Sequence, residues 1–151
     1  MPAVTDFTKA KFIKVLESTD KFRAIEELAP VFKGSDICND IDNLIRALKE
    51  REEIMSTGIG FGIAIPHAKI DSVNEMAFAI GISKEGIDFD SMDGEPIHLV
   101  IMVVAGERQH KEYLRLLSNI MSILKKDDVK QRIIDSSSNE EALKILQEYS
   151  Q

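Results

Sequence analysis

Three histidines are the side chains best suited to chemistry in this chain of 151 residues. His67 follows Pro66 directly after a short apolar run, at the kind of strand end where sites in α/β folds gather. A neutral imidazole is a good nucleophile near pH 7 because its unperturbed pKa is ~6.5. His67 is therefore a candidate acceptor of a phosphoryl group that needs no separate base. On these residues alone, a structural role for a histidine in a loop stays open as the alternative.

His110 and Arg51 are candidate partners of such a phosphoryl group. His110 opens a predicted helix, and the unpaired N–H groups of a helix N-terminus favour anions. From there its ring can donate a hydrogen bond to phosphoryl oxygens. Arg51 has a planar fork of donors that suits phosphate. The alternatives are a surface residue near a helix cap for His110 and a solvated helix-end residue for Arg51. His98 lies inside a predicted strand, and we interpret it as structural.

A glycine cluster at 58–62 separates Arg51 from His67. We predict a loop here, in which the backbone N–H groups of Gly58 and Gly60 converge on an anion. The hydroxyl groups of Ser56 and Thr57 add two further donors to this predicted phosphoryl-binding support. The alternative is a loop that needs glycine only for its positive φ angles.

Several other kinds of chemistry lack their motifs. The glycine spacing is G-x-G-x-G and a strand follows, so it is no dinucleotide fingerprint, and no Walker A loop occurs. No G-x-S-x-G is present, and the lone Cys38 is interpreted as a packing residue beside a helical stripe. A metal site is disfavoured because no cysteine pair and no i, i+4 histidine pair exists; its ligands would be His67, His98, His110 and Asp71. We expect no cofactor and no metal.

The spacing of apolar residues predicts a layered α/β fold. Helical periodicity covers 20–33, 36–51 and 109–125, and strand-like segments are 12–16, 63–66, 76–82 and 97–105. Helices flank a central group of strands at both ends of the sequence. We therefore predict one domain over residues 1–151, with helices on both faces of a sheet.

The composition excludes some classes of function. The net charge of −7 argues against nucleic acid, which attracts basic surfaces. The N-terminal residues show no signal-peptide pattern, and the longest nearly apolar stretch, 97–105, is too short to span a bilayer, which takes ~20 residues. We expect a cytoplasmic protein without membrane insertion.

Three stretches resemble one known family. Residues 51–69 (REEIMSTGIGFGIAIPHAK), 86–100 (GIDFDSMDGEPIHLV) and 109–117 (QHKEYLRLL) are similar to type-2 enzyme IIA domains. These domains belong to the bacterial phosphoenolpyruvate-dependent sugar phosphotransferase system, in its fructose/mannitol and nitrogen-regulatory family. The resemblance covers nearly the whole chain. It departs from many relatives in a shorter loop at 104–109, before His110.

The resemblance implies a phosphocarrier. His67 would receive the phosphoryl group from the histidine phosphocarrier protein and deliver it to a cysteine or histidine of the next component, commonly enzyme IIB. His110 and Arg51 match the family positions that support the phosphoryl group, and the implied fold is a mixed sheet with helices on both faces. A sugar-uptake component of the fructose type and a nitrogen-regulatory phosphoprotein would share this site. A binding module that has lost transfer is a third alternative, disfavoured because all three residues are retained.

Overall fold

Two long apolar strands form the centre of the sheet. In the computed structural model, which describes residues 3–149, strand β5 (Ala77–Ile87) lies antiparallel to β6 (Ile97–Ala105). Eight of the nine residues of β6 are buried, because helices cover both faces of the sheet. Such a run, apolar without alternation, is typical of a strand covered on both faces.

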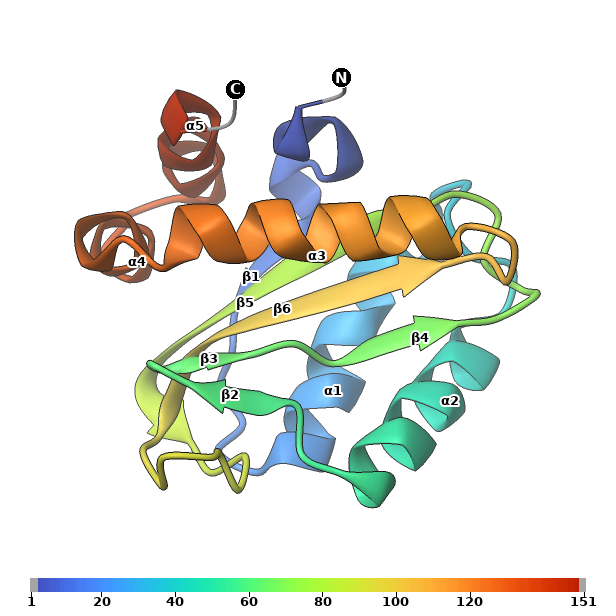
Figure 1. Cartoon of the computed structure of the whole chain (residues 1–151), viewed down its shortest axis with the longest axis horizontal. Coiled ribbons are helices and arrows are strands. Elements are labelled where there is room, and N and C mark those ends of the chain that lie inside the picture. Colours follow the sequence, from blue (N-terminus) through green and yellow to red (C-terminus); the bar gives the residue numbers. More distant parts are fainter. Residues whose placement is uncertain (1–2, 150–151) are drawn as a thin grey trace.

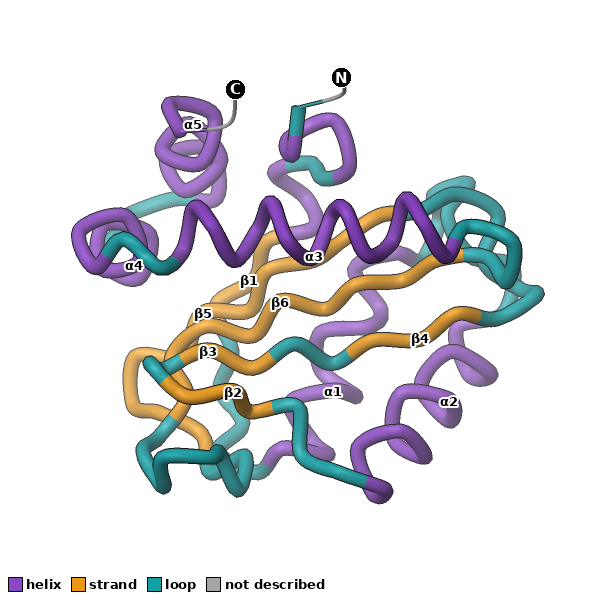
Figure 2. The backbone as a smooth tube through the Cα atoms, viewed as in Figure 1, coloured by secondary structure: helices purple, strands orange, loops and turns teal. Residues whose placement is uncertain are grey.

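Four shorter strands complete the sheet in the order β1-β5-β6-β3-β2, with β4 also on β6 (Figure 2). Strand β1 (Ile13–Val15) pairs in parallel with β5. Strands β3 (Ile63–Ala64) and β4 (His67–Lys69) both pair in parallel with β6, and β2 (Gly58–Gly60) runs antiparallel to β3 at the edge. The sheet is therefore mixed.

Helices form a layer on each face of this sheet (Figure 1). Helices α1 (Lys21–Leu28) and α2 (Ile41–Ile54) pack on one face, and α3 (His110–Leu124), α4 (Asp127–Ile134) and α5 (Asn139–Tyr149) pack on the other. Within residues 3–149 there are also three short 3-10 helices, η1 (Val4–Phe7), η2 (Ala10–Phe12) and η3 (Ala29–Phe32). The predicted α/β class with helices on both faces is confirmed.

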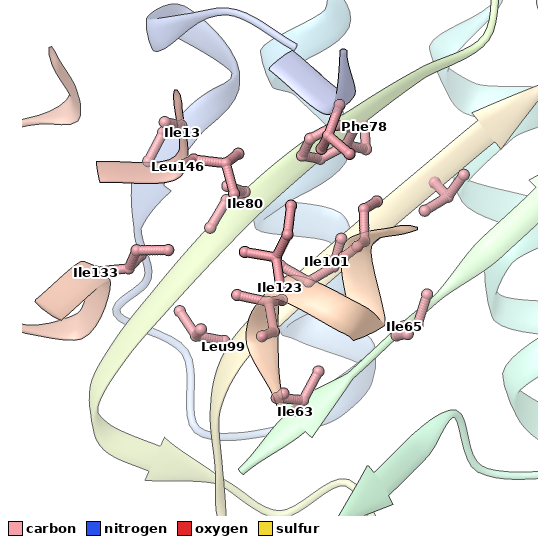
Figure 3. Packing of buried hydrophobic residues seen from close by; sticks show 14 of the residues in the cluster. Ile13, Ile63, Ile65, Phe78, Ile80, Leu99, Ile101, Ile123, Ile133 and Leu146 are labelled. Atoms are coloured by element: carbon pink, nitrogen blue, oxygen red, sulfur yellow. The ribbon is translucent and has the colours of Figure 1, made fainter. Parts of the chain in front are cut away.

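Each face of the sheet has its own hydrophobic core. Figure 3 shows the core under α3, where Ile123 lies over Leu99 and Ile101 of β6 and near Ile63 and Ile65. The other core includes Leu44 and Leu48 of α2 with Val100, Met102 and Val104 of β6. Alternate residues of β6 thus fix the position of both helical layers.

A proline interrupts the strand that carries His67. Strands β3 and β4 keep one register along β6, with Ile63 opposite Leu99 and His67 opposite Val103. Pro66 has no N–H, so it cannot donate to a neighbouring strand. Its carbonyl still accepts from the N–H of Val103 at 3.0 Å. The interruption therefore preserves side-chain alternation, and His67 and Lys69 share one face of the sheet while Ala68 is buried on the other.

Several predicted bounds are confirmed and others are corrected. The strand at 97–105 and the helix at 109–125 agree with β6 and α3, whereas the helix predicted over 36–51 begins only at Ile41. Asp40 sets that start, because its side chain accepts a hydrogen bond from the N–H of Asn43. The helix predicted over 20–33 is α1 followed by the 3-10 helix η3, which has Pro30 in its first turn.

Two local predictions were wrong. Cys38 precedes α2 and forms an isolated bridge with Val73, so its surroundings are not helical, although the thiol is buried as expected. The glycine cluster is not wholly a loop, because Gly58–Gly60 pair with β3. Only the turn at Phe61 and Gly62 leaves the sheet, and both of these residues have positive φ.

Candidate functional site

A backbone hydrogen bond orients the imidazole of His67. Its Nδ1 lies 2.8 Å from the carbonyl oxygen of Ile65. A carbonyl only accepts, so Nδ1 must carry the proton, and a neutral ring then has its lone pair on Nε2. The N–H of Ile65 is bonded to the carbonyl of Thr57, which holds this turn against the start of β2. The fold thus presents His67 as a nucleophile through Nε2.

Burial keeps this imidazole neutral. Removal from water lowers the pKa of His67 from its ordinary value of 6.5, and the positive charge of Arg51 lowers it further. The hydrogen bond to Ile65 and the carboxylate of Glu52 act in the opposite direction. The net lowering leaves the lone pair available at neutral pH.

We expect two neighbouring substitutions to move the pKa of His67 in opposite directions. Arg51→Gln removes a positive charge and should raise it, whereas Glu52→Gln removes a negative charge and should lower it. NMR titration of the ring Cε1–H reports the midpoint directly. A shift in the same direction for both variants would contradict an electrostatic origin.

The lowered pKa also predicts how folding stability depends on pH. Below pH 6.5 the unfolded chain binds a proton at His67 that the folded chain binds only at lower pH. The stabilising contribution of this site is therefore complete above pH 6.5 and declines as pH falls through the lowered pKa. His67→Gln should flatten that part of the stability profile in urea unfolding at a series of pH values. An unchanged profile would be the contrary result.

An apolar depression of about 500 Å³ adjoins His67. Arg51 also lines it, and the guanidinium donates from Nη1 to the carbonyl of Met55 at 2.8 Å. That bond uses one of five N–H donors, and the others stay available for an anion. The remaining wall is mostly apolar and consists of Met55, Ser56, Thr57, Ile59, Ile65, Met92, Leu117, Ser118 and Met121.

Internal hydrogen bonds occupy the groups expected to support a phosphoryl group. Glu52, only 1% exposed, accepts from the N–H of Thr57 at 2.8 Å and from its hydroxyl at 2.6 Å. The Ser56 hydroxyl donates to the carbonyl of Phe89 and accepts from the N–H of Gly58. In this structure Ser56 and Thr57 therefore shape the wall beside His67, and Gly58 supports that wall through its bond to Ser56. The contact of these three residues with a phosphoryl group stays a prediction.

Gly60 lies apart from the depression. Its φ is +97°, and an added Cβ would lie 3.1 Å from Oδ2 of Asp93. The same carboxylate accepts the N–H of Phe61 at 3.1 Å. An acidic side chain thus already occupies the anion position of this turn, and a phosphoryl-binding role for Gly60 stays a prediction that this geometry does not favour.

The buried carboxylate of Glu52 connects the end of α2 to the wall of the site. Lys21 lies 3.8 Å from it, and the Lys21 ammonium also pairs with Asp90. We expect Glu52→Ala to lower the free energy of unfolding by about 2–3 kcal/mol, because two donors of Thr57 and a shielded cation lose their acceptor. Urea unfolding measures this loss.

The neighbouring residue supplies the matched control for that substitution. Glu53 is exposed on the same helix, so Glu53→Ala should change the free energy of unfolding by less than about 0.5 kcal/mol. Equal effects of the two substitutions would mean that the buried hydrogen bonds of Glu52 add no stability.

His110 lies outside the depression, beside Lys69 and Tyr113. The Nζ of Lys69 is 2.5 Å from Nδ1 of His110 and 5.2 Å from the centroid of the Tyr113 ring. The same ring has its centroid 5.8 Å from that of His67 and 6.4 Å from that of His110. Tyr113 therefore connects the two histidines that the sequence singled out.

Sequence reasoning did not place Tyr113 at the site. Leu114 beside it is 50% exposed, whereas Tyr113 is buried. Its position three residues after His110, on the same helical face, was the available signal. Burial raises the pKa of Tyr113 to about 12, so its phenol keeps its proton at neutral pH.

The third histidine has a partner in the sheet. Nδ1 of His98 lies 2.8 Å from the carbonyl oxygen of Ser83 on the neighbouring strand, in agreement with a structural role. Among residues 3–149, no group of three or more His, Cys, Asp or Glu side chains is placed to hold a metal ion. None of the helices in this range combines the length and apolar character needed to cross a membrane.

The chain is an α/β domain with a depression that His67 lines. The model of the family "Phosphoenolpyruvate-dependent sugar phosphotransferase system, EIIA 2" matches residues 6–149, and the chain belongs to this family. The resemblance found in residues 51–69, 86–100 and 109–117 is thereby confirmed.

Relatives from two branches of the family are similar to the chain. It is 35% identical over 147 residues to the fructose-specific EIIABC component of Bacillus subtilis, covering 97% of this chain but only 23% of that protein. It is 37% identical to the fructose-specific EIIA component of Haloferax volcanii, covering 83% of this chain and 81% of that one. The nitrogen regulatory protein IIA-Ntr of Neisseria meningitidis has the same fold with a TM-score of 0.87 and 26% identity, covering 95% and 98% of the two chains.

Proposed function

We propose that this protein is a phosphocarrier that accepts a phosphoryl group on Nε2 of His67 from the histidine phosphocarrier protein. It then passes the group to enzyme IIB of a fructose-type permease. One observation carries the proposal: the bond from Nδ1 of His67 to the carbonyl of Ile65, which leaves Nε2 as the nucleophile beside the depression. Membership of the enzyme IIA family and a neutral imidazole at pH 7 support it.

The transfer step needs neither a metal nor a nucleotide. The Nε2 lone pair of His67 attacks phosphorus, and the P–N bond to the donor histidine breaks as the new bond forms. The electron pair of that bond returns to the donor imidazole. Onward transfer repeats the step with a cysteine or histidine of enzyme IIB as the nucleophile and His67 as the leaving group. Because both reacting groups are side chains held in line, positioning and charge stabilisation supply the catalysis.

Arg51 and His110 stabilise the charge on the transferring group. Arg51 lies in the depression with His67 and has donors left beyond its bond to Met55. Its positive charge offsets the phosphoryl charge, which matters in a chain with a net charge of −7. His110 approaches from the side of α3, next to Tyr113. The apolar wall of the depression gives a partner protein a dry surface beside His67.

The experiment is phosphorylation in a reconstituted system. The protein is incubated with phosphoenolpyruvate, enzyme I and the histidine phosphocarrier protein, and intact-mass analysis is expected to show one added phosphoryl group. The modification should be labile in acid and stable in alkali, as a phosphohistidine is. Omission of enzyme I is the control. No added mass, or an acid-stable modification, would refute the proposal.

A nitrogen-regulatory phosphoprotein is the second candidate, favoured by the full-length match to IIA-Ntr. The two candidates share the first transfer and differ in the second. Addition of a purified enzyme IIB of the fructose type should discharge the phosphorylated protein if it serves sugar uptake. We favour sugar uptake because the fructose-specific relatives are more similar in sequence to this chain than IIA-Ntr is. In addition, the name of one of these relatives, EIIABC component, lists an A unit together with B and C units. Retention of the phosphoryl group in the presence of enzyme IIB would favour the regulatory candidate.

A further inference from the structure

Lys69 occupies a place that the proposed function leaves without a role. It lies two residues after His67 on β4, so both side chains project from the same face of the sheet. Helix α3 begins at His110 soon after β6 ends, and β6 is the strand that pairs with β4. This pairing places Nζ of Lys69 2.5 Å from Nδ1 of His110, across 41 positions of sequence.

The chemistry of this contact allows one arrangement of protons. A lysine ammonium has three N–H donors and no acceptor, so Nδ1 of His110 must be the acceptor. A neutral imidazole with a lone pair on Nδ1 has its proton on Nε2. We propose that Lys69 is a positioning residue that fixes His110 in the Nε2–H tautomer, so that Nε2–H is the donor to the phosphoryl group. This inference deepens the proposed function and rests on it for the role of that donor.

Tyr113 holds the lysine in place. The Lys69 ammonium lies over its ring, a cation–π contact at 5.2 Å from the centroid. The ring is only 4% exposed, so it is a fixed surface rather than a mobile side chain. Both imidazoles contact this ring region, with centroids 5.8 Å and 6.4 Å away for His67 and His110. The position of Lys69 is thus set by packing on one side and by His110 on the other.

The two site histidines then have opposite tautomers. His67 donates from Nδ1 to a carbonyl and keeps its lone pair on Nε2, as a nucleophile requires. His110 accepts at Nδ1 from an ammonium and keeps its proton on Nε2, as a donor to phosphoryl oxygens requires. His98 also faces a carbonyl through Nδ1 and therefore shares the tautomer of His67. His98 thus serves as an internal reference for the tautomer of His67, with which His110 can be compared.

Nitrogen NMR of the protein with 15N-labelled histidine tests the tautomers without any phosphoryl donor. At a pH where the rings are neutral, His67 and His98 should show a lone pair on Nε2, and His110 alone should show it on Nδ1. In Lys69→Met the two nitrogen shifts of His110 should move toward each other, because both tautomers become populated. Lys69→Arg keeps donors and charge and should preserve the wild-type pattern, as should Lys111→Met beside His110.

Either of two spectra would overturn the inference. One is a wild-type His110 with its proton on Nδ1 or shared between the nitrogens, and the other is an unchanged pattern in Lys69→Met. Chemical shifts of His98 and the backbone amides show whether each variant is folded. This measurement tests the tautomer of His110 even if the proposed function is wrong, since it needs only the unmodified protein.

Transfer kinetics test the connection to function. With the phosphorylated histidine phosphocarrier protein as donor, Lys69→Met should slow phosphoryl uptake about tenfold, less than the ~10²–10³ expected for loss of the donor itself. In the His110→Ala background the same substitution should have no further effect, because Lys69 acts through His110. A full additional loss in the double variant would show that Lys69 acts independently and would overturn the positioning role. Failure of the wild-type protein to accept any phosphoryl group would refute the proposed function instead.

Discussion

His67→Gln is expected to abolish phosphoryl uptake altogether, because no other group occupies the position of the Nε2 lone pair. Glutamine approximates the size of the imidazole and can donate to the carbonyl of Ile65, so the turn at Pro66 should survive. Intact-mass analysis after incubation with phosphoenolpyruvate, enzyme I and the histidine phosphocarrier protein should show no added mass.

His98→Gln is the matched control for this result. His98 has the same type of bond, from Nδ1 to a carbonyl, but it lies within β6 and does not line the depression. Its replacement should lower stability while uptake continues. Phosphorylation of a folded His67→Gln protein at an unchanged rate would assign the acceptor to another residue.

His110→Ala is expected to slow uptake by ~10²–10³, a loss of roughly 3–4 kcal/mol in transition-state stabilisation. The covalent bond forms on His67, so the reaction continues without the hydrogen bond from the second histidine. Onward transfer to enzyme IIB should slow as well, since the same oxygens bear charge in both directions. Rapid-quench measurement of the phosphorylated fraction gives both rates.

The neighbouring Lys111→Ala controls for a general effect on the start of α3, because Lys111 is exposed. It should leave both rates nearly unchanged. Complete loss of uptake in a folded His110→Ala protein would contradict the division of roles between the two histidines. Full activity of that protein would remove His110 from the mechanism.

Local sequence patterns correctly predicted those helices and strands whose positions depend on neighbouring residues in the chain. The unbroken apolar run of β6 is visible within a few residues. The start of α1 is visible in the same way, because Asp20 is a good N-cap residue and its side chain accepts the N–H of Arg23. The start of α2 was misplaced because Ile37 fits the helical stripe and Cys38 lies beside it. The competing cap at Asp40 and the bridge from Cys38 to Val73 exclude both residues from the helix. The strand Gly58–Gly60 has little strand propensity and depends on pairing with β3, which no local pattern encodes.

The candidate site was likewise predictable from the sequence only in part. His67, Arg51 and His110 could be chosen by residue type and by the family resemblance. The contact between Lys69 and His110 could not, because it depends on the parallel pairing of β4 with β6. The internal partner of Thr57 was also beyond sequence reasoning, since Glu52 reads as one more acidic residue at a helix end and is in fact buried.

The bond between His67 and the backbone of Ile65 has a consequence for the direction of transfer. A carbonyl oxygen has no proton to gain or lose at physiological pH, unlike the carboxylate or second imidazole that orients many reactive histidines. The ring can therefore keep Nδ1–H on Ile65 while a phosphoryl group arrives at Nε2 and while it departs. In the proposed reaction the protein would exchange no proton with solvent in either half, so the ring of His67 would not make the transfer equilibrium depend on pH. The phosphorylated fractions of the partner proteins would then set the direction of phosphoryl transfer through such a carrier. The direction would reverse when those fractions are reversed.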